Sequence, residues 1–227
     1  MRRMACLAFG VASFVLLAGC SKPDTRSLFD IARDGTPQAV KAAMDRAKGT
    51  NGNMREYTQG KTLLMWAAQF NGNPEVTAVI LKSGADLEAR DYDSSAYGWT
   101  ALMWAADSSK NPEVITTLVK AGADVKAKDK EGFTPLLIAA ENNENAAVVA
   151  RVASVGSDLE AQDNNGYTAL MQAASKNHNP DVVLALLSAG ANAKAKNAKG
   201  YTALDYAKVN LYLKNTDAFK KLEEASR

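Results

Sequence analysis

Cysteine and histidine are scarce in this chain of 227 residues. There are two cysteines, Cys6 and Cys20, and one histidine, His178. A disulfide framework needs several paired cysteines, and most zinc sites need clusters of cysteine and histidine. The composition therefore excludes most frameworks of either kind, and the fold must be held together by packing.

An excess of charge of one sign is also missing. Lysine and arginine number 27 and aspartate and glutamate 25, which gives a formal net charge of +2. Arg2 and Arg3 supply that excess, so residues 20–227 carry no net charge. Proteins that bind DNA or RNA gather phosphates with a positive field. We therefore expect no nucleic acid partner.

The first twenty residues, MRRMACLAFGVASFVLLAGC, have the three-part pattern of an export signal. Their apolar run is shorter than a membrane-spanning helix requires. The ending Leu17-Ala18-Gly19-Cys20 resembles the lipobox of bacterial lipoproteins. That resemblance implies a signal peptide over 1–19, a lipid on Cys20 and a lipidated linker over 20–25. An ordinary secretory signal or an uncleaved anchor is the alternative.

By the same resemblance, Ser21 after the cysteine favours the outer membrane of a bacterium. We therefore expect a lipid-anchored envelope protein that faces the periplasm and meets the membrane through its anchor. Cys6 is then removed with the signal and Cys20 is lipidated. No thiol remains for a disulfide, although the periplasm is oxidising.

The rest of the chain is repetitive. Strings of the type TALMWAA begin at five threonines that are 38, 34, 34 and 34 residues apart: Thr62, Thr100, Thr134, Thr168 and Thr202. Glycines that begin the motif GAD or its variants form a second series: Gly84, Gly122, Gly156 and Gly190. Motifs such as NPEV form a third, at Asn73, Asn111, Asn145 and Asn179. Three markers in one fixed order identify a repeat protein.

Each marker predicts a local structure. The threonines are N-caps of a first helix, and the asparagines are N-caps of a second. The glycines end the second helix in a left-handed conformation. An extended stretch with period two follows, and tight turns such as the one from Asp129 to Gly132 then complete a protruding hairpin.

Helix, turn, helix and hairpin in this order resemble the ankyrin repeat. The resemblance implies an all-α ankyrin-repeat solenoid in which each repeat carries a β-hairpin finger. It divides the chain after the linker into a divergent repeat over 26–61, four repeats over 62–99, 100–133, 134–167 and 168–201, and a capping repeat over 202–227.

The repeats depart from the family pattern at an informative position. The histidine of the family motif TPLHxA is replaced by Met65, Met103, Leu137, Met171 and Asp205. That histidine usually forms hydrogen bonds between repeats, so we expect greater reliance on apolar contact. Along the hairpins, equivalent positions alternate in sign, which predicts weak ion pairs between adjacent repeats: Glu88, Lys126, Glu160 and Lys194.

Sequence motifs give no support for catalysis. Gly60-Lys61-Thr62 resembles the end of a phosphate-binding loop, but Arg55 stands where that motif needs a glycine. His178 has no further histidine and no free thiol to complete a metal site. Neither a nucleophile elbow nor a dinucleotide-binding loop occurs. We therefore expect no enzyme, no cofactor, no metal and no small-molecule substrate.

A protein partner is the remaining expectation. Partners of ankyrin proteins usually contact the fingers and the inner helix faces. The position before each repeat threonine is therefore a candidate, and it holds Lys61 and then four aromatic residues, Trp99, Phe133, Tyr167 and Tyr201. Aromatic residues with polar handles are frequent hot spots, whereas the alternative reading is that they pack against the adjacent hairpin.

Positions just past the first helix add Phe70 to these candidates, together with polar residues: Gln69, Asp107, Ser108, Glu141, Asn142, Ser175 and Lys176. Trp66 and Trp104 are predicted to be buried. The hairpin between Asp91 and Gly98 is four residues longer than its counterparts and contains Tyr92 and Tyr97. Insertions in repeat proteins often gather on the binding face, so both tyrosines are candidates.

The sequence thus predicts a membrane-tethered periplasmic module that binds a partner protein through its concave groove and hairpin tips. An inhibitor or immunity-type protein that blocks a toxin or enzyme is one alternative. A passive envelope component is another.

Overall fold

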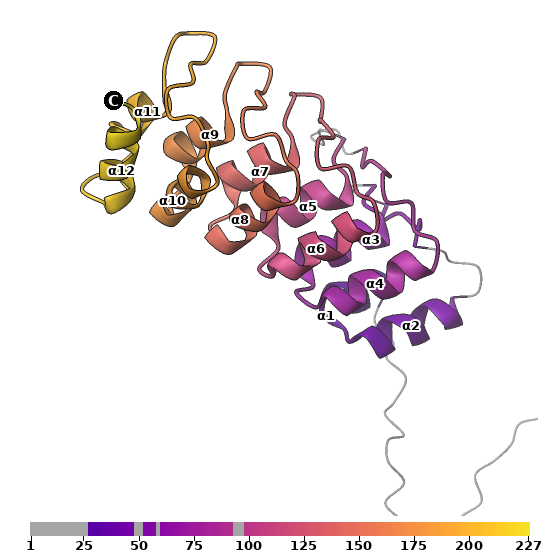
Figure 1. Ribbon diagram of the computed structural model, residues 1–227. Coiled ribbons are helices and arrows are strands. Elements are labelled where there is room, and N and C mark those ends of the chain that lie inside the picture. Colours follow the sequence, from indigo (N-terminus) through magenta and orange to yellow (C-terminus); the bar gives the residue numbers. More distant parts are fainter. Residues whose placement is uncertain (1–26, 48–51, 58–59, 93–97) are drawn as a thin grey trace, which may run out of the picture.

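The computed structural model describes residues 27–47, 52–57, 60–92 and 98–227. The predicted signal and linker, Cys20 and Tyr97 lie outside these residues. The described part is a curved rod of stacked helix pairs with long loops projecting from one edge (Figure 1). Among the helices of this part, none is both long and apolar enough to cross a membrane.

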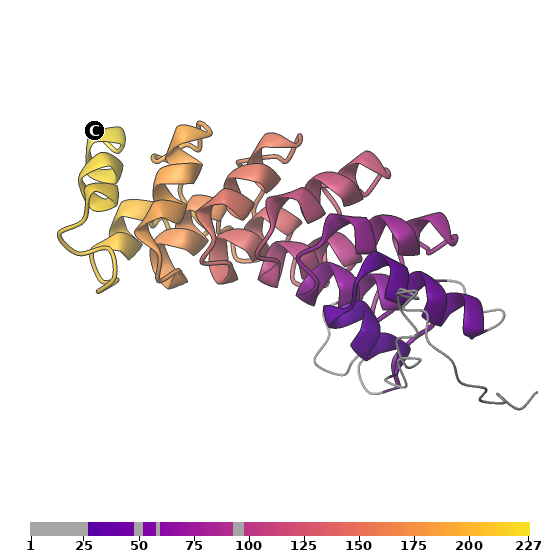
Figure 2. The same cartoon turned by 90° about the horizontal axis from the view of Figure 1, so that it is seen from below.

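The helices form two rows along the rod (Figure 2). The inner row consists of α1 (Leu28–Asp34), α3 (Leu63–Phe70), α5 (Ala101–Ser108), α7 (Pro135–Asn142), α9 (Ala169–Lys176) and α11 (Ala203–Ala207). The outer row consists of α2 (Pro37–Arg46), α4 (Pro74–Lys82), α6 (Pro112–Lys120), α8 (Ala146–Ser154), α10 (Pro180–Ser188) and α12 (Asp217–Ala225). Each helix contacts the next helix of its own row and its partner in the repeat, so cohesion comes from neighbouring repeats.

The predicted helix caps are confirmed. Thr100 accepts a hydrogen bond from the backbone N of Met103, and the other repeat threonines cap their inner helices in the same way. Asn111 caps α6 by accepting from the backbone N of Glu113. Gly122 has a φ of 103° after the end of α6, a conformation that is strained for any residue with a Cβ.

A continuous core lies between the rows. Ala105 and Ala106 are fully buried, and their small side chains let α5 approach α3 and α7 closely. Met65, Met103 and Met171, which stand in place of the family histidine, are also fully buried. Their flexible side chains fill the spaces between the helices.

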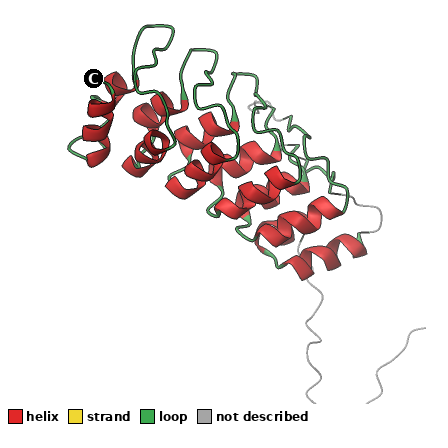
Figure 3. Cartoon of the chain, viewed as in Figure 1, coloured by secondary structure: helices red, strands yellow, loops and turns green. Residues whose placement is uncertain are grey.

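In the described residues the fingers are loops and not paired strands (Figure 3), apart from one isolated bridge between Arg55 and Thr62, so the β-hairpin prediction is wrong in detail. A backbone hydrogen bond closes each base, as between Asp129 N and Phe133 O at 3.0 Å. Asp129 Oδ1 accepts from the amides of Glu131 and Phe133, and thus takes donors that a strand ladder would use. The predicted extended stretch is likewise turned, because Asp124 Oδ1 accepts from the amide of Lys126 at 2.9 Å.

The predicted ion pairs between fingers are wrong. None of the ion pairs found among the described residues joins two of Glu88, Lys126, Glu160 and Lys194. Glu88 instead accepts a hydrogen bond from the backbone N of Asp124 at 3.0 Å, and Glu160 accepts from that of Asn192 at 2.8 Å. A carboxylate gains more from a backbone donor than two exposed charges gain from each other.

Buried asparagines join the inner helices of successive repeats. Asn143 Nδ2 donates to the carbonyls of Ala106 and Ser109 in the preceding repeat at 3.0 and 3.1 Å. Three equivalent residues make the same paired contact: Asn71, Asn177 and Asn210. We call these four residues the asparagine ladder. Hydrogen bonding between repeats thus persists although the family histidine is replaced.

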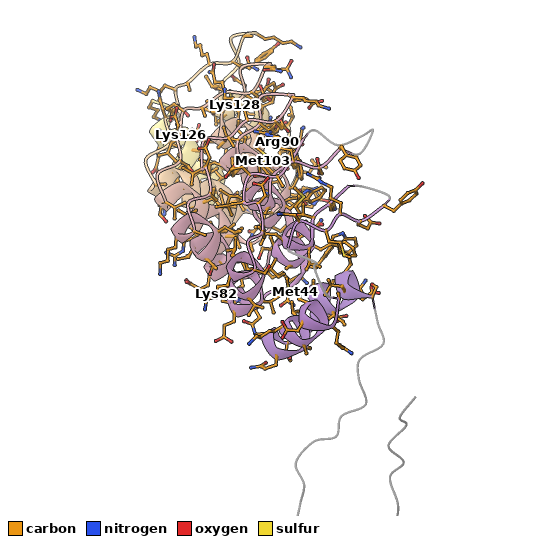
Figure 4. All side chains as sticks on the ribbon, turned by 90° about the vertical axis from the view of Figure 1, so that its right-hand side faces the viewer. Met44, Lys82, Arg90, Met103, Lys126 and Lys128 are labelled. Carbon is orange, nitrogen blue, oxygen red and sulfur yellow. The ribbon has the colours of Figure 1, made fainter. Side chains whose placement is uncertain are left out.

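A second set of hydrogen bonds joins the fingers and points the other way along the chain. Arg55, Arg90, Lys128 and Gln162 each donate to the backbone carbonyl at the equivalent position of the next finger. The Arg90 Nη1 to Lys128 O distance is 2.9 Å, and Figure 4 shows both residues in the finger layer. We call these four residues the finger ladder.

Candidate protein-binding groove

A groove runs between the fingers and the inner row of helices. Its first cavity, of about 160 Å³, lies between Trp99 and Phe133, and a second, of about 450 Å³, lies between Phe133 and Tyr167. A larger hollow of about 730 Å³ lies along the turns between the helices. It is lined by Asn143, Asn145 and other residues whose amides already bond the preceding repeat. The groove is therefore the better candidate site.

Three predicted aromatic residues line the groove. Trp99, Phe133 and Tyr167 are each half-buried. Trp99 and Phe133 pack on their inner side against Met103, Ala127 and Ile138. The rings of Trp99 and Phe133 therefore pack against their neighbours on one side and line the groove on the other.

The remaining predicted aromatics lie apart from these cavities. Phe70 is 47% exposed and its ring centroid is 5.0 Å from that of Trp66. Tyr201 is 51% exposed and stands edge-on to Tyr206. Tyr92 is 62% exposed, but one face of its ring lies against Gly60, where an added Cβ would come within 2.6 Å. Tyr92 therefore also joins two fingers.

Trp66 and Trp104 are half-buried, so the prediction that they are buried is wrong. They stand four residues after the repeat threonine, a position that faces the groove and not the outer row. The Lys61 ammonium lies 3.3 Å from the centroid of the Trp104 ring and 5.8 Å from that of Trp66. Lys61 is only 4% exposed, so a hydrogen bond to Gln69 Oε1 at 2.9 Å and the cation–π contact together take the place of hydration.

The finger bases fix the orientation of the groove side chains. The indole Nε1 of Trp99 donates to Asp129 Oδ2, and that of Trp104 donates to Asp91 Oδ2, both at 2.9 Å. One repeat on, Gln172 Nε2 donates to Asp163 Oδ2 at 2.9 Å. At the last finger, Asn197 Nδ2 donates to the Tyr206 hydroxyl, which donates to the Tyr167 hydroxyl at 2.8 Å. The groove is thus held in one arrangement before any partner arrives.

These contacts alter two acid–base equilibria. Burial raises the pKa of Asp91, opposed by hydrogen bonds from Trp99 and Trp104 and by the charge of Lys61. Burial also raises the pKa of Tyr206, and its contact with Tyr167 acts in the same direction. Within the described residues, no cluster of histidine, cysteine, aspartate and glutamate has the composition of a metal site.

Carboxylates and acceptors gather in the middle of the groove. Asp129, Glu131 and Glu141 line the first cavity. Lys176 Nζ donates to Glu141 Oε1 at 2.6 Å, whereas Glu141 Oε2 is buried without a hydrogen-bond partner. The buried Oε1 of Gln172 in the second cavity also lacks one. The side-chain amide of Gln172 cannot adopt the opposite orientation, because its nitrogen must face the Asp163 carboxylate.

Sequence reasoning followed the position before each threonine and the positions just past the first helix. The latter include four residues that line the two cavities: Glu141, Asn142, Ser175 and Lys176. Two other columns of groove residues were missed. The position four after each threonine also faces the groove, and holds Trp66, Trp104, Ile138, Gln172 and Tyr206. The Asx residue at each finger base forms a third column: Asp91, Asp129, Asp163 and Asn197. Both columns recur at the repeat spacing, and that periodicity was the available signal.

Comparison with protein families agrees with this architecture. The family model described as ankyrin repeats (3 copies) matches residues 28–129, 102–197 and 136–224. The chain is an ankyrin-repeat protein. Comparison with curated protein sequences gave no match. Ankyrin repeats are general protein–protein interaction modules.

Proposed function

We propose that this ankyrin-repeat protein is a non-catalytic binding module that holds a partner protein in its groove, and that a lipid on Cys20 tethers it to a bacterial envelope membrane facing the periplasm. The observation that carries the binding role is the row of half-buried aromatic side chains along the groove, of which Trp99 and Trp104 are held by hydrogen bonds to the finger bases. A rigid surface loses little conformational freedom on binding. The tether rests on the sequence Leu17-Ala18-Gly19-Cys20.

Photocrosslinking in cells tests the binding role. A photoreactive residue replaces Phe133 or Tyr167 in the groove, and in a matched control it replaces Lys120, which is exposed at the end of outer helix α6. We expect a discrete adduct of one mass from the groove positions and none from Lys120. The absence of a groove adduct would favour a passive envelope component.

Metabolic labelling tests the tether separately. A fatty-acid analogue should label the wild-type chain, and Cys20→Ser should abolish both the label and membrane fractionation. Retained labelling in that variant would exclude Cys20 as the lipid attachment site.

A further inference from the structure

The cavity between Trp99 and Phe133 differs from its neighbour in charge. Its described lining residues include three carboxylates, those of Asp129, Glu131 and Glu141, and no lysine or arginine. The second cavity is lined by Lys176 and Lys199 as well as by acidic residues. Glu141 is paired with Lys176 at 2.6 Å, whereas Asp129 and Glu131 have no ion pair among the described residues. The lining of the first cavity is therefore net negative.

The size of this cavity limits its occupant. At about 160 Å³ it is smaller than the usual 300–1,000 Å³ of a small-molecule site. It is of the size of a single amino-acid side chain. Its walls are two aromatic rings, from Trp99 and Phe133, and its floor includes the buried side chain of Ile138. Aromatic faces and carboxylates together favour a cation.

One of the residues that line this cavity, Glu141, has a carboxylate oxygen without a donor. Glu141 Oε1 is bound by Lys176, but Glu141 Oε2 is buried without a hydrogen-bond partner among the described residues. A buried carboxylate oxygen without a donor is costly. The carboxylate of Glu141 is therefore only partly compensated by Lys176.

The chain itself fills the equivalent position one repeat upstream with a cation. There Lys61 stands in place of Trp99, Asp91 in place of Asp129, and Trp104 in place of Ile138. The Lys61 ammonium lies over the Trp104 ring, and its charge acts on Asp91. The same architecture therefore accommodates a buried ammonium group in the preceding interval.

From the charge, the size and the upstream lysine, we propose that the cavity between Trp99 and Phe133 receives an arginine or lysine side chain of the partner. This inference rests on the proposed function, because it requires a partner in the groove. It specifies that partner's chemistry: a segment that places a basic residue opposite Glu131 and Glu141 and continues over Tyr167.

Selection of displayed random dodecapeptides against the purified full-length chain tests the proposal. We expect the selected peptides to share a basic residue. The groove double variant Glu131→Gln/Glu141→Gln should bind them at least tenfold more weakly. The matched control Glu113→Gln/Glu144→Gln removes two exposed carboxylates outside these cavities and should change affinity less than twofold.

A double-mutant cycle assigns the contact. Replacing the basic residue of the peptide by citrulline or norleucine should cost tenfold in the wild-type chain and little in the groove double variant. Peptides that compete at Phe133 and Tyr167 but lack a basic residue, or whose basic residue shows no such coupling, would overturn the cation proposal and leave the groove function intact. Selection of no peptide sensitive to Phe133→Ala or Tyr167→Ala would overturn both.

Discussion

From α3 onward, a buried side chain follows each inner helix on the side of the preceding repeat, and its identity changes once along the chain. Asn71, Asn143, Asn177 and Asn210 bond two carbonyls of the neighbour, whereas Ser109 contacts Asn111 in its own repeat. The asparagine ladder therefore lacks one rung, between the repeats that contain α3 and α5.

Asn143→Ala should be strongly destabilising. The substitution leaves the carbonyls of Ala106 and Ser109 and the amide of Asn145 without their side-chain partner. Three lost hydrogen bonds in a buried site should cost about 2–4 kcal/mol of unfolding free energy, measured by urea denaturation. Asn142→Ala is the matched control, because exposed Asn142 donates only to Asp107 and its loss should cost less than about 1 kcal/mol.

Ser109→Asn should act in the opposite direction. Ser109 is 2% exposed and occupies the ladder position, so an asparagine there would reach the end of α3 as Asn143 reaches the end of α5. We expect a gain of about 1 kcal/mol in unfolding free energy, read from the same denaturation curves. A loss of stability would show that the α3–α5 junction has no space for the longer side chain.

Asp205 gives a pH-dependent contribution with a defined sign. Hydrogen bonds from the Thr202 amide and hydroxyl hold the pKa of Asp205 below its ordinary value of 3.8. The ionised carboxylate therefore stabilises the fold above pH 3.8, and that contribution is lost as the pH falls through the lower pKa of the folded state.

Asp205→Asn should consequently lower the Tm near neutral pH, and the difference from wild type should shrink as the pH falls toward 3. Thermal unfolding followed by circular dichroism at several pH values measures both curves. A difference that stays constant with pH would mean that the charge of Asp205 does not contribute.

At the scale of elements, the fingers depend on side chains for their shape. Arg90 Nη1 donates to Gly98 O in its own finger and to Lys128 O in the next. Arg90→Met should therefore speed amide exchange in the fingers around Asp91 and Asp129, while the free energy of unfolding falls by only about 1 kcal/mol. Lys82→Met is the control, because Lys82 is exposed on α4 (Figure 4). Unchanged exchange in the fingers would show that Arg90 does not hold them.

The helices were predictable at this scale, and the fingers were not. Threonine and asparagine caps and left-handed glycines act locally, so their spacing predicts the helix ends. The fingers follow Asx side chains that compete with the backbone ladder, and period-two patterning does not report that competition. Likewise, the sequence of one repeat suggests that Arg90 and Lys128 are solvated charges, whereas in the fold both donate to carbonyls of the next finger.

The groove was predictable only in part. The aromatic residue before each threonine was visible as a column in the repeats. Which face of Trp104 is covered depends on the finger that carries Asp91 and on Lys61 from the repeat before. Such relations join residues of different repeats, and a single repeat read by itself does not contain them.

At the scale of the whole molecule, the C-terminal end of the rod has a polar outer face. The C-terminal helix α12 buries Ala218 and Leu222 against α10 and presents Lys220, Lys221, Glu223 and Glu224 to solvent. Terminal repeats with a polar outer face keep such arrays soluble.

Truncation after Gly200 should therefore lower the Tm and cause aggregation. It removes α11 and α12, and with them the fully buried Leu213 and Leu222, so the apolar faces of α9 and α10 become exposed. Light scattering and calorimetry measure the two effects. A soluble truncated chain with an unchanged Tm would mean that the last pair of helices is not a cap.

The two ladders point in opposite directions along the rod: finger side chains reach toward the C-terminus, and turn asparagines reach toward the N-terminus. The α5–α7, α7–α9 and α9–α11 interfaces carry both kinds of hydrogen bond, so sliding one of these repeats over the next breaks bonds whichever way it moves. Under a stretching force, the repeats should separate first at one interface, and the rod should not extend evenly along its length. The interface that opens first should be the one beside Ser109, where the paired asparagine contact is missing and the turn is held by the bond from Asn111 Nδ2 to Gly72 O at 2.7 Å.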